Sequence, residues 1–323
     1  MRTIGVAGVL FAVAMVAGAV LYPGNALAQK KNITFNSGCL PGMYFHLASA
    51  ITKVVEEKAG DIDVTLQPVV SSIINSKMIG AGEADVVTVQ NDIAYYALKG
   101  IEPFFSKPIA NIRGIASLYT ESVQIQARKD AGIASVKDLK GKRVAVGPQG
   151  TMPVETTLQV LEAYGLSLKD LAKVEYMTIN EAANALMANK IDALFFLGAV
   201  GYPSMGGTAS KVETVIVPVE GEPAAALMKK YPYYVKGRIP SGIYKGVGAD
   251  VPTLAMYTMI AARAELDNET AYRITKAIFE NLKTIAPSHG VGKQIKVETA
   301  LAGMPIPVHP GAEKYYREAG LVK

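Results

Sequence analysis

Hydrophobic and polar positions follow two different periods through residues 32–90. The segment NITFNSG (32–38) reads as a strand, and apolar side chains then recur at helical spacing from 44 to 55. A second strand pattern, IDVTLQPVV (62–70), is followed by a short helix that ends in glycine (72–82) and by an apolar strand, ADVVTVQ (84–90). Helical crossovers between apolar strands predict an α/β fold with parallel sheets and helices on both faces.

A long extended stretch, 111–129, interrupts this alternation before a second unit of the same kind begins. The second unit has strand patterns at 143–147, 173–179 and 191–198, with helical patterns between them. The segment VPTLAMYTMIAAR (251–263) is a late strand candidate, and Asp267 is the expected N-cap of a strong helix over 267–286. A final helix is expected at 311–320.

This order predicts two similar lobes with a cleft at the hinge between them. The stretch 111–129 would carry the chain out of the first lobe, and the late strand would carry it back. We expect lobe 1 over 29–118, lobe 2 over 119–255, and a return strand with C-terminal helices that complete lobe 1 over 256–323. Half of the 323 residues are hydrophobic, which is sufficient for sizeable cores.

The first 28 residues predict a secretory signal peptide. They combine Arg2, an apolar run from 4 to 21, a Pro-Gly break at 23–24 and the small-residue triplet Ala-Leu-Ala at 26–28. A membrane anchor is the alternative, but the break and the triplet favour cleavage after Ala28. We therefore expect a periplasmic protein. Its net charge of +5 is spread over isolated basic residues, which argues against a nucleic-acid partner.

Catalytic and metal chemistry find little support in the sequence. Cys39 is the single cysteine, so no internal disulfide can form, and it lies too far beyond the apolar run to be a lipid anchor. A Cys39–His46 nucleophile would need a third, orienting group, and none is recognisable. The three histidines do not have metal-ligand spacing, and GPQGT lacks the ending of a phosphate-binding loop. We predict no enzyme activity and no cofactor or metal.

Four loops at the carboxyl ends of predicted strands are candidates for ligand binding. They are 37–44, 71–75, 147–153 and 198–205, and their side chains are mostly uncharged hydrogen-bonding groups. Ligands of parallel α/β sheets bind at such strand ends, where the N–H groups of the next helix are unpaired. The loops favour a small polar anion held by amides and hydroxyls. Among the tyrosines, Tyr44 and Tyr244 stand beside glycine-containing turns.

The chain resembles the TRAP-associated extracytoplasmic immunogenic (TAXI) family. The resemblance rests on SGCLPGMYFHLASAI, SSIINSKMIGAGEADVVTVQNDIAYYALKG, LKGKRVAVGPQGT, KIDALFFLGAVGYP, YYVKGRIPSGIYKG and IPVHPGAEKYYREAG, in this order. It implies a two-lobed, type II-like periplasmic binding protein fold. It also implies a monomeric receptor that closes on a small carboxylate, such as a glutamate-like amino acid, a dicarboxylate or a keto acid, and delivers it to the membrane subunits of a TRAP transporter.

The family motifs map onto residues of the candidate loops. Gly38 and Tyr44 match a Gly-to-Tyr turn, and Gly150-Thr151-Met152-Pro153 stands where the family usually has Gly-Ser-Gly-Thr. Ser37 and Phe45 also depart from the usual threonine and tyrosine. The matches Ser72 with Asn75, and Gln90 with Asp92, complete the first lobe. The candidate ligand-binding residues are Gly38, Cys39, Tyr44, Ser72, Asn75, Gln90, Asp92, Gln149, Gly150, Thr151, Gly201, Tyr202 and Tyr244.

Two other functions are compatible with the same cleft. A secreted enzyme is one, although Cys39 and scattered carboxylates are its only support in the sequence. A receptor that serves an ABC importer or a sensor kinase is the other, and it shares the fold and the binding step. Because no arginine lies in the candidate loops, we expect amides and hydroxyls to recognise the carboxylate.

Overall fold

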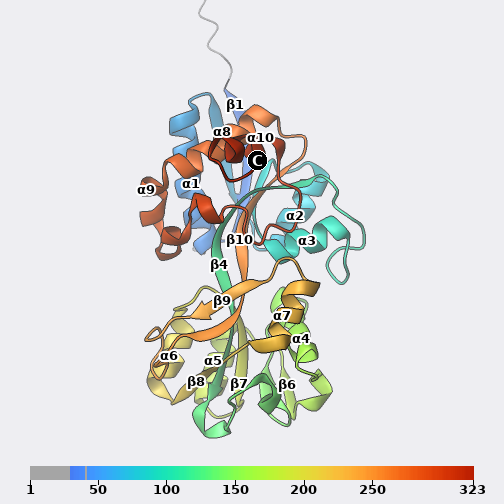
Figure 1. Ribbon diagram of the computed structural model, residues 1–323, viewed down its shortest axis with the longest axis vertical. Coiled ribbons are helices and arrows are strands. Elements are labelled where there is room, and N and C mark those ends of the chain that lie inside the picture. Colours follow the sequence, from blue (N-terminus) through green and yellow to red (C-terminus); the bar gives the residue numbers. More distant parts are fainter. Residues whose placement is uncertain (1–29, 41) are drawn as a thin grey trace, which may run out of the picture.

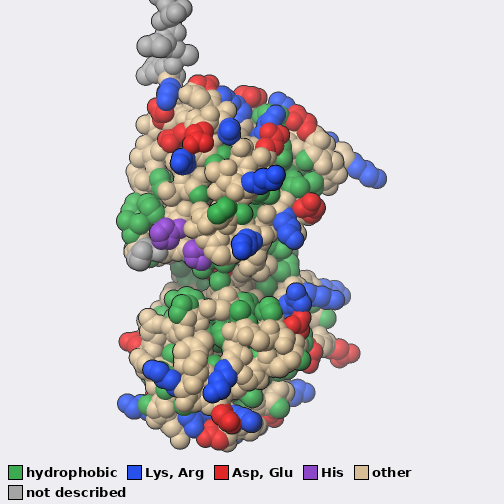
Figure 2. All heavy atoms as spheres, turned by 90° about the vertical axis from the view of Figure 1, so that its left-hand side faces the viewer, with side chains coloured by type: hydrophobic (Ala, Val, Ile, Leu, Met, Phe, Trp, Pro, Cys, Tyr) green, Lys and Arg blue, Asp and Glu red, His purple; other side chains and the backbone are tan. Residues whose placement is uncertain are grey.

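The computed structural model describes residues 30–40 and 42–323. Within them, the strands form one mixed sheet in the order β2-β1-β3-β10-β4-β7-β5-β6, with β8 beside β4 and β9 beside β10. The chain has two rounded halves joined by a narrower waist (Figure 2), and two long strands run through this waist (Figure 1). The predicted signal peptide, residues 1–28, lies outside the described residues.

Lobe 1 contains the βαβαβ unit that the sequence predicts, confirmed nearly element by element. Strands β1 and β2 pair in parallel, as do β1 and β3. Helical crossovers make this arrangement possible, because parallel neighbours need a long connection. The elements are β1 (Lys31–Ser37), α1 (Met43–Ala59), β2 (Ile62–Pro68), α2 (Ser72–Ala81), β3 (Val86–Gln90) and α3 (Asn91–Lys99).

Lobe 2 repeats the alternation with shorter strands. Strand β5 pairs in parallel with β6 and β7, so this half also has a parallel portion. The elements are β5 (Arg143–Ala145), α4 (Met152–Ala163), β6 (Lys173–Glu175), α5 (Ile179–Met187), β7 (Ala193–Gly198), α6 (Pro203–Lys211), β8 (Thr214–Val217), α7 (Gly221–Lys230) and β9 (Val235–Ile239).

The two long strands β4 (Ile112–Arg128) and β10 (Val251–Arg263) connect the lobes. They pair with each other in antiparallel fashion and continue into both halves (Figure 1). β10 is antiparallel to β3, and β4 is antiparallel to β7. The sheet is therefore mixed, whereas the sequence predicts parallel-type sheets, because each hinge strand enters a lobe against the direction of its neighbours. The expected boundaries at 118/119 and 255/256 fall inside these strands.

The C-terminal helices return to lobe 1, as the late strand predicts. They are α8 (Asn268–Glu280), α9 (Leu282–Ile285) and α10 (Pro310–Glu318). Asp267 caps α8, because its Oδ1 accepts a hydrogen bond of 2.9 Å from the Thr270 N–H. Both hinge strands are buried along most of their length, so they form part of the hydrophobic core as well as the connection. None of the described helices combines the length and the apolar character needed to cross a membrane.

Candidate functional site

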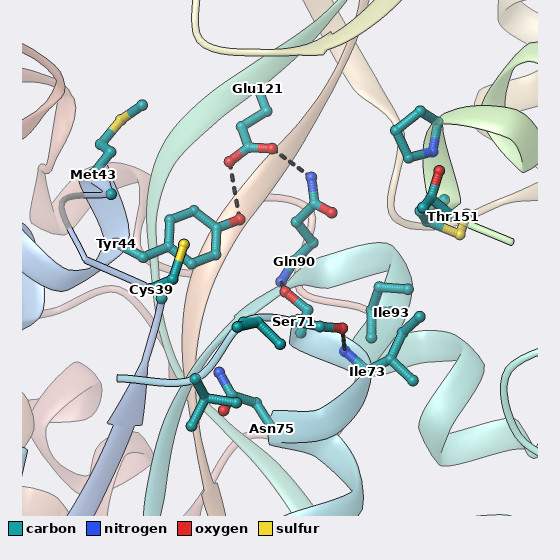
Figure 3. A pocket seen from close by; sticks show the side chains of 17 residues that line it. Cys39, Met43, Tyr44, Ser71, Ile73, Asn75, Gln90, Ile93, Glu121 and Thr151 are labelled. Carbon is teal, nitrogen blue, oxygen red and sulfur yellow. Dashed lines mark hydrogen bonds between the residues drawn. The ribbon is translucent and has the colours of Figure 1, made fainter. Parts of the chain in front are cut away.

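A cavity of about 410 Å³ lies where the loops after β1, β2 and β3 face the hinge strand β4 and the start of α4 (Figure 3). Its lining comes from the described part of both lobes, and fourteen of the seventeen residues come from lobe 1 or β4. These residues are Gly38, Cys39, Gly42, Met43, Tyr44, Val69, Val70, Ser71, Ser72, Ile73, Asn75, Gln90, Ile93, Glu121, Thr151, Met152 and Pro153.

The first loop positions Tyr44 at the start of α1. The Ser37 hydroxyl donates to the Tyr44 carbonyl over 2.9 Å, which fixes the turn. A Cβ atom added at Gly38 would lie 2.6 Å from the Cβ of Tyr44, so only glycine allows this close approach. Cys39 lines the cavity beside them with an exposed free thiol.

The second loop is held by its own polar side chains. The Ser71 hydroxyl caps α2 by accepting from the Ile73 N–H over 3.1 Å, and the Ser72 hydroxyl accepts from the Gln90 N–H over 3.2 Å. The buried Asn75 amide donates to the Thr88 carbonyl over 2.8 Å. Ser72 and Asn75 therefore line the cavity while they join α2 to the end of β3.

Glu121 places a carboxylate in the cavity wall, and sequence reasoning missed it. Its Oε1 accepts hydrogen bonds from the Tyr44 hydroxyl (2.9 Å) and the Thr258 hydroxyl (2.8 Å), and its Oε2 accepts one from the Gln90 amide (Figure 3). Burial raises the pKa of the Glu121 carboxyl above its usual value, while these three donors and the buried Tyr119 hydroxyl act in the opposite direction. Lobe 1 and both hinge strands thus meet at one carboxylate.

Lobe 2 contributes only the first turn of α4 to the cavity. Thr151, Met152 and Pro153 are its lining residues, and Figure 3 shows Thr151 across the cavity from Tyr44. The Thr151 hydroxyl donates to the Pro148 carbonyl over 2.6 Å, so it does not cap α4. Gln149 and Gly150 belong to the same turn but are not among the lining residues.

Asp92 lies outside the cavity although its neighbour Gln90 lines it. Its side chain is fully buried, and its Oδ1 accepts from the Ile93 N–H over 2.6 Å. Burial raises the pKa of the Asp92 carboxyl to about 7, and the nearby charge of Glu121 acts in the same direction. The pattern Gln-x-Asp thus places one residue in the wall and the other beneath it.

The loop after β7 also lies outside the cavity. Tyr244 is buried, and its hydroxyl donates to the Gln124 side chain over 2.7 Å and accepts from the Gly201 N–H over 2.8 Å. Tyr202 packs against Phe196 with ring centroids 4.7 Å apart. The structure therefore gives Gly201, Tyr202 and Tyr244 packing and bracing contacts within lobe 2, and none of them lines the cavity.

The lining does not assemble a catalytic or metal-binding group. The described lining residues include no histidine, lysine or arginine. Among the described residues, no three His, Cys, Asp or Glu side chains are arranged to hold a metal ion. What the cavity offers is one carboxylate, several hydroxyls and amides, two helix starts without side-chain caps and an apolar surface.

Comparison with known proteins identifies the family. A family model described as the NMT1-like family matches residues 35–320, which is most of the chain. The chain belongs to the NMT1-like family. Membership of the NMT1-like family does not by itself show that the chain is a TAXI protein, which stays a prediction.

Solved structures share the fold of this NMT1-like protein. A protein described as the periplasmic sulfonate-binding protein SsuA of a sulfonate ABC transporter from Methylobacillus flagellatus KT is 16% identical. The match covers 92% of this chain and 89% of that chain, with a TM-score of 0.52. XAC2383 from Xanthomonas citri bound to ATP is 12% identical, with 90% and 97% covered and a TM-score of 0.53. These matches confirm the predicted two-lobed α/β periplasmic binding protein fold.

Proposed function

We propose that this NMT1-like protein is an extracytoplasmic receptor that binds a small solute carrying a carboxylate and delivers it to a membrane importer. The observation that carries the proposal is the cavity at the junction of the lobes, with lining from both lobes and two continuous strands as the hinge. Such a cavity can enclose a solute when the lobes rotate about the strands. The receptor would act as a monomer in the periplasm, without a nucleic-acid partner.

Two helix starts support the binding of a carboxylate. Gly42 is the N-cap of α1 and Thr151 is the N-cap of α4, and neither helix has a side-chain cap. The first N–H groups of a helix lack intrahelical partners and carry partial positive charge. The start of α4 offers fewer of them, because Pro153 has no N–H and the Val154 N–H is bonded to the Thr151 carbonyl. Because α1 and α4 belong to different lobes, a carboxylate bound by both would be held more tightly when the lobes close.

The unequal lining suggests an order of events. A solute would first contact lobe 1 and β4, which supply fourteen of the lining residues, and the start of α4 would then close over it. Closure is favoured only by contacts that are better in the closed state than in the open state. Thr151 to Pro153 are therefore the residues that would convert binding into closure.

Two classes of importer are candidates for the partner. The sequence resemblance favours a TRAP transporter, whereas the structural similarity to the sulfonate-binding protein of an ABC transporter from Methylobacillus flagellatus KT favours an ABC importer. Uptake by vesicles that contain the matching membrane subunits distinguishes the two. Uptake that requires ATP identifies an ABC importer, and uptake that requires an ion gradient without ATP identifies a TRAP permease.

A thermal-shift screen of the mature chain with amino acids, dicarboxylates and keto acids tests the receptor proposal. A solute at 100 times its Kd adds about 2.7 kcal/mol of stability, which is a rise in Tm of about 5 °C. Mass spectrometry of solutes that copurify gives an independent identification. The proposal fails if no member of the panel raises Tm and no small solute copurifies, or if a bound solute is converted to product, which would indicate an enzyme.

A further inference from the structure

Glu121 places a buried negative charge in the cavity wall without a balancing cation. Its side chain is 7% exposed, and it is the one charged side chain among the described lining residues. Its three hydrogen-bond donors, Tyr44, Gln90 and Thr258, are all neutral. A buried carboxylate without an opposite charge is costly, so packing alone is a poor reason for its presence.

The three hydrogen bonds leave one acceptor position of this carboxylate free, although the buried Tyr119 hydroxyl, which has no hydrogen-bond partner of its own among the described residues, also lies beside Glu121. The two oxygens of an ionised carboxylate accept about four hydrogen bonds. Oε1 already accepts two, from Tyr44 and Thr258, whereas Oε2 accepts one, from Gln90. Both oxygens point toward the side of the cavity where Tyr44 and Gln90 lie (Figure 3). A positively charged N–H donor is the strongest partner for the free position.

The rest of the wall is unsuitable for a second negative charge on the solute. Several lining side chains are apolar, namely Met43, Val69, Val70, Ile73, Ile93, Met152 and Pro153. A second carboxylate would find no lysine or arginine among the described lining residues, and it would be repelled by the charge of Glu121. An uncharged side chain on the solute fits this surface better.

We infer that Glu121 determines specificity by binding the protonated amino group of the solute, so that the receptor selects zwitterionic amino acids with uncharged side chains. The ammonium group donates to Oε2 of Glu121, and the carboxylate meets the N–H groups that begin α1 and α4. This inference rests on the proposed receptor function. It narrows the solute class by excluding dicarboxylates and keto acids.

Calorimetry with matched probes tests this selection. The probes are the uncharged L-amino acids, each paired with the 2-hydroxy acid and the 2-keto acid of the same carbon skeleton, together with L-glutamate, 2-hydroxyglutarate and 2-oxoglutarate. The wild-type protein should bind at least one uncharged amino acid about 100-fold more tightly than its hydroxy acid, because a buried charge pair is lost in the hydroxy acid. Glu121→Gln keeps the shape of the side chain and should reduce this ratio to about 10-fold or less.

Glu155→Gln is the matched control, because it removes a carboxylate from α4 that does not line the cavity. It should leave the ratio unchanged. The inference is wrong if the wild-type protein binds a hydroxy acid, keto acid or dicarboxylate as tightly as any amino acid, although the receptor function would then stand. This comparison of probes on the wild-type protein tests the inference even if Glu121→Gln fails to fold. If no probe binds the wild-type protein, the receptor proposal itself fails.

Discussion

Lobe 1 and lobe 2 approach the cavity with loops of the same kind, each from a strand end to a helix start, but they present different groups. Lobe 1 presents the side chains of Tyr44, Ser72, Asn75 and Gln90, and two of them, Tyr44 and Gln90, donate to Glu121 of the hinge. Lobe 2 presents one helix start. Gly201, Tyr202 and Tyr244, its other predicted ligand-binding residues apart from Gln149 and Gly150, make contacts within the lobe instead.

The difference lies in which polar groups already have partners. In lobe 2, the Thr151 hydroxyl is bonded to the Pro148 carbonyl, and the Tyr244 hydroxyl is bonded to Gln124 and Gly201. On the lobe 1 side, Glu121 keeps a free acceptor position that faces the cavity. We therefore expect substitutions in lobe 1 to change solute affinity and substitutions in the lobe 2 loops to change mainly stability.

Asp92 provides the largest expected effect, because it is a lobe 1 carboxylate that does not reach the cavity. Its pKa in the folded protein is about 7, against an ordinary value of 3.8. The folded state thus binds more protons than the unfolded state between these values, so stability falls as pH rises from about 4 to about 7. We expect the wild-type protein to lose about 2 kcal/mol of unfolding free energy between pH 5 and pH 8, a loss that Asp92→Asn should not show. Urea denaturation of both proteins at the two pH values measures this difference.

Asp138→Asn is the control for this pH dependence. Asp138 is exposed, and hydrogen bonds from the Ser135 backbone and side chain lower the pKa of its carboxyl. Both states therefore have this group ionised from pH 5 to pH 8, and its substitution should shift stability by the same amount at each pH. A pH-independent difference between Asp92→Asn and wild type would contradict a buried carboxyl with a raised pKa.

Tyr244→Phe tests the lobe 2 side of the comparison. The substitution leaves the Gln124 side-chain oxygen and the Gly201 N–H without their present partner, which should cost about 2 kcal/mol of unfolding free energy. Solute affinity should change by no more than about twofold, since Tyr244 does not line the cavity.

Tyr44→Phe, the corresponding substitution in lobe 1, should lower solute affinity more than stability. Tyr44→Phe removes the 2.9 Å hydrogen bond to Glu121, and solute affinity should fall about 10-fold with a smaller loss of stability. Denaturation and calorimetry on both variants give the two profiles. Equal losses of affinity in the two variants would remove the distinction between the lobes.

Gly38→Ala tests whether the first loop positions Tyr44. Because the new Cβ would lie 2.6 Å from the Tyr44 Cβ, the ring must move, and affinity should fall about 10-fold. Gly207→Ala in α6 is the matched control, as its Cβ would meet no atom within 4 Å. It should leave affinity unchanged and raise stability by up to about 1 kcal/mol. Unchanged affinity in Gly38→Ala would show that the position of Tyr44 is not required.

Thr151→Ala should have the smallest effect. The hydroxyl supports its own turn through Pro148, so its removal should weaken solute-bound closure and lower affinity about threefold while the fold persists. Calorimetry measures the affinity, and small-angle scattering measures the compaction on binding. Affinity equal to that of wild type would exclude Thr151 from the site.

Local patterns were sufficient to predict most of the fold. Periodicity located the strands and helices of lobe 1 and those of lobe 2 as far as β7, but not the elements from α6 to β9. The aspartate before a long apolar helix identified the cap at Asp267. The antiparallel direction of β4 and β10 was not predictable, because strand direction depends on how distant segments pair. Pattern reasoning placed the crossovers correctly and predicted parallel-type sheets, but it gave the two hinge strands no direction.

The site was predicted less completely, because a loop position does not reveal where a side chain points. Tyr44, Ser72, Asn75, Gln90 and Thr151 line the cavity, as do Gly38 and Cys39. Tyr244 stands beside a glycine turn in the same way, yet its ring is buried. Glu121 was missed because it lies near the middle of a strand, away from the turns that were searched, although it is the one carboxylate of that strand and was a usable signal for this reason.

A crystal structure of the protein with the amino acid that raises Tm most tests directly whether Glu121 binds the amino group of the solute. We predict that the solute lies in this cavity, that its nitrogen is about 3 Å from Oε2 of Glu121, and that its carboxylate faces the start of α1 or α4. A solute with its carboxylate toward Glu121, or one bound elsewhere in the protein, would contradict the account.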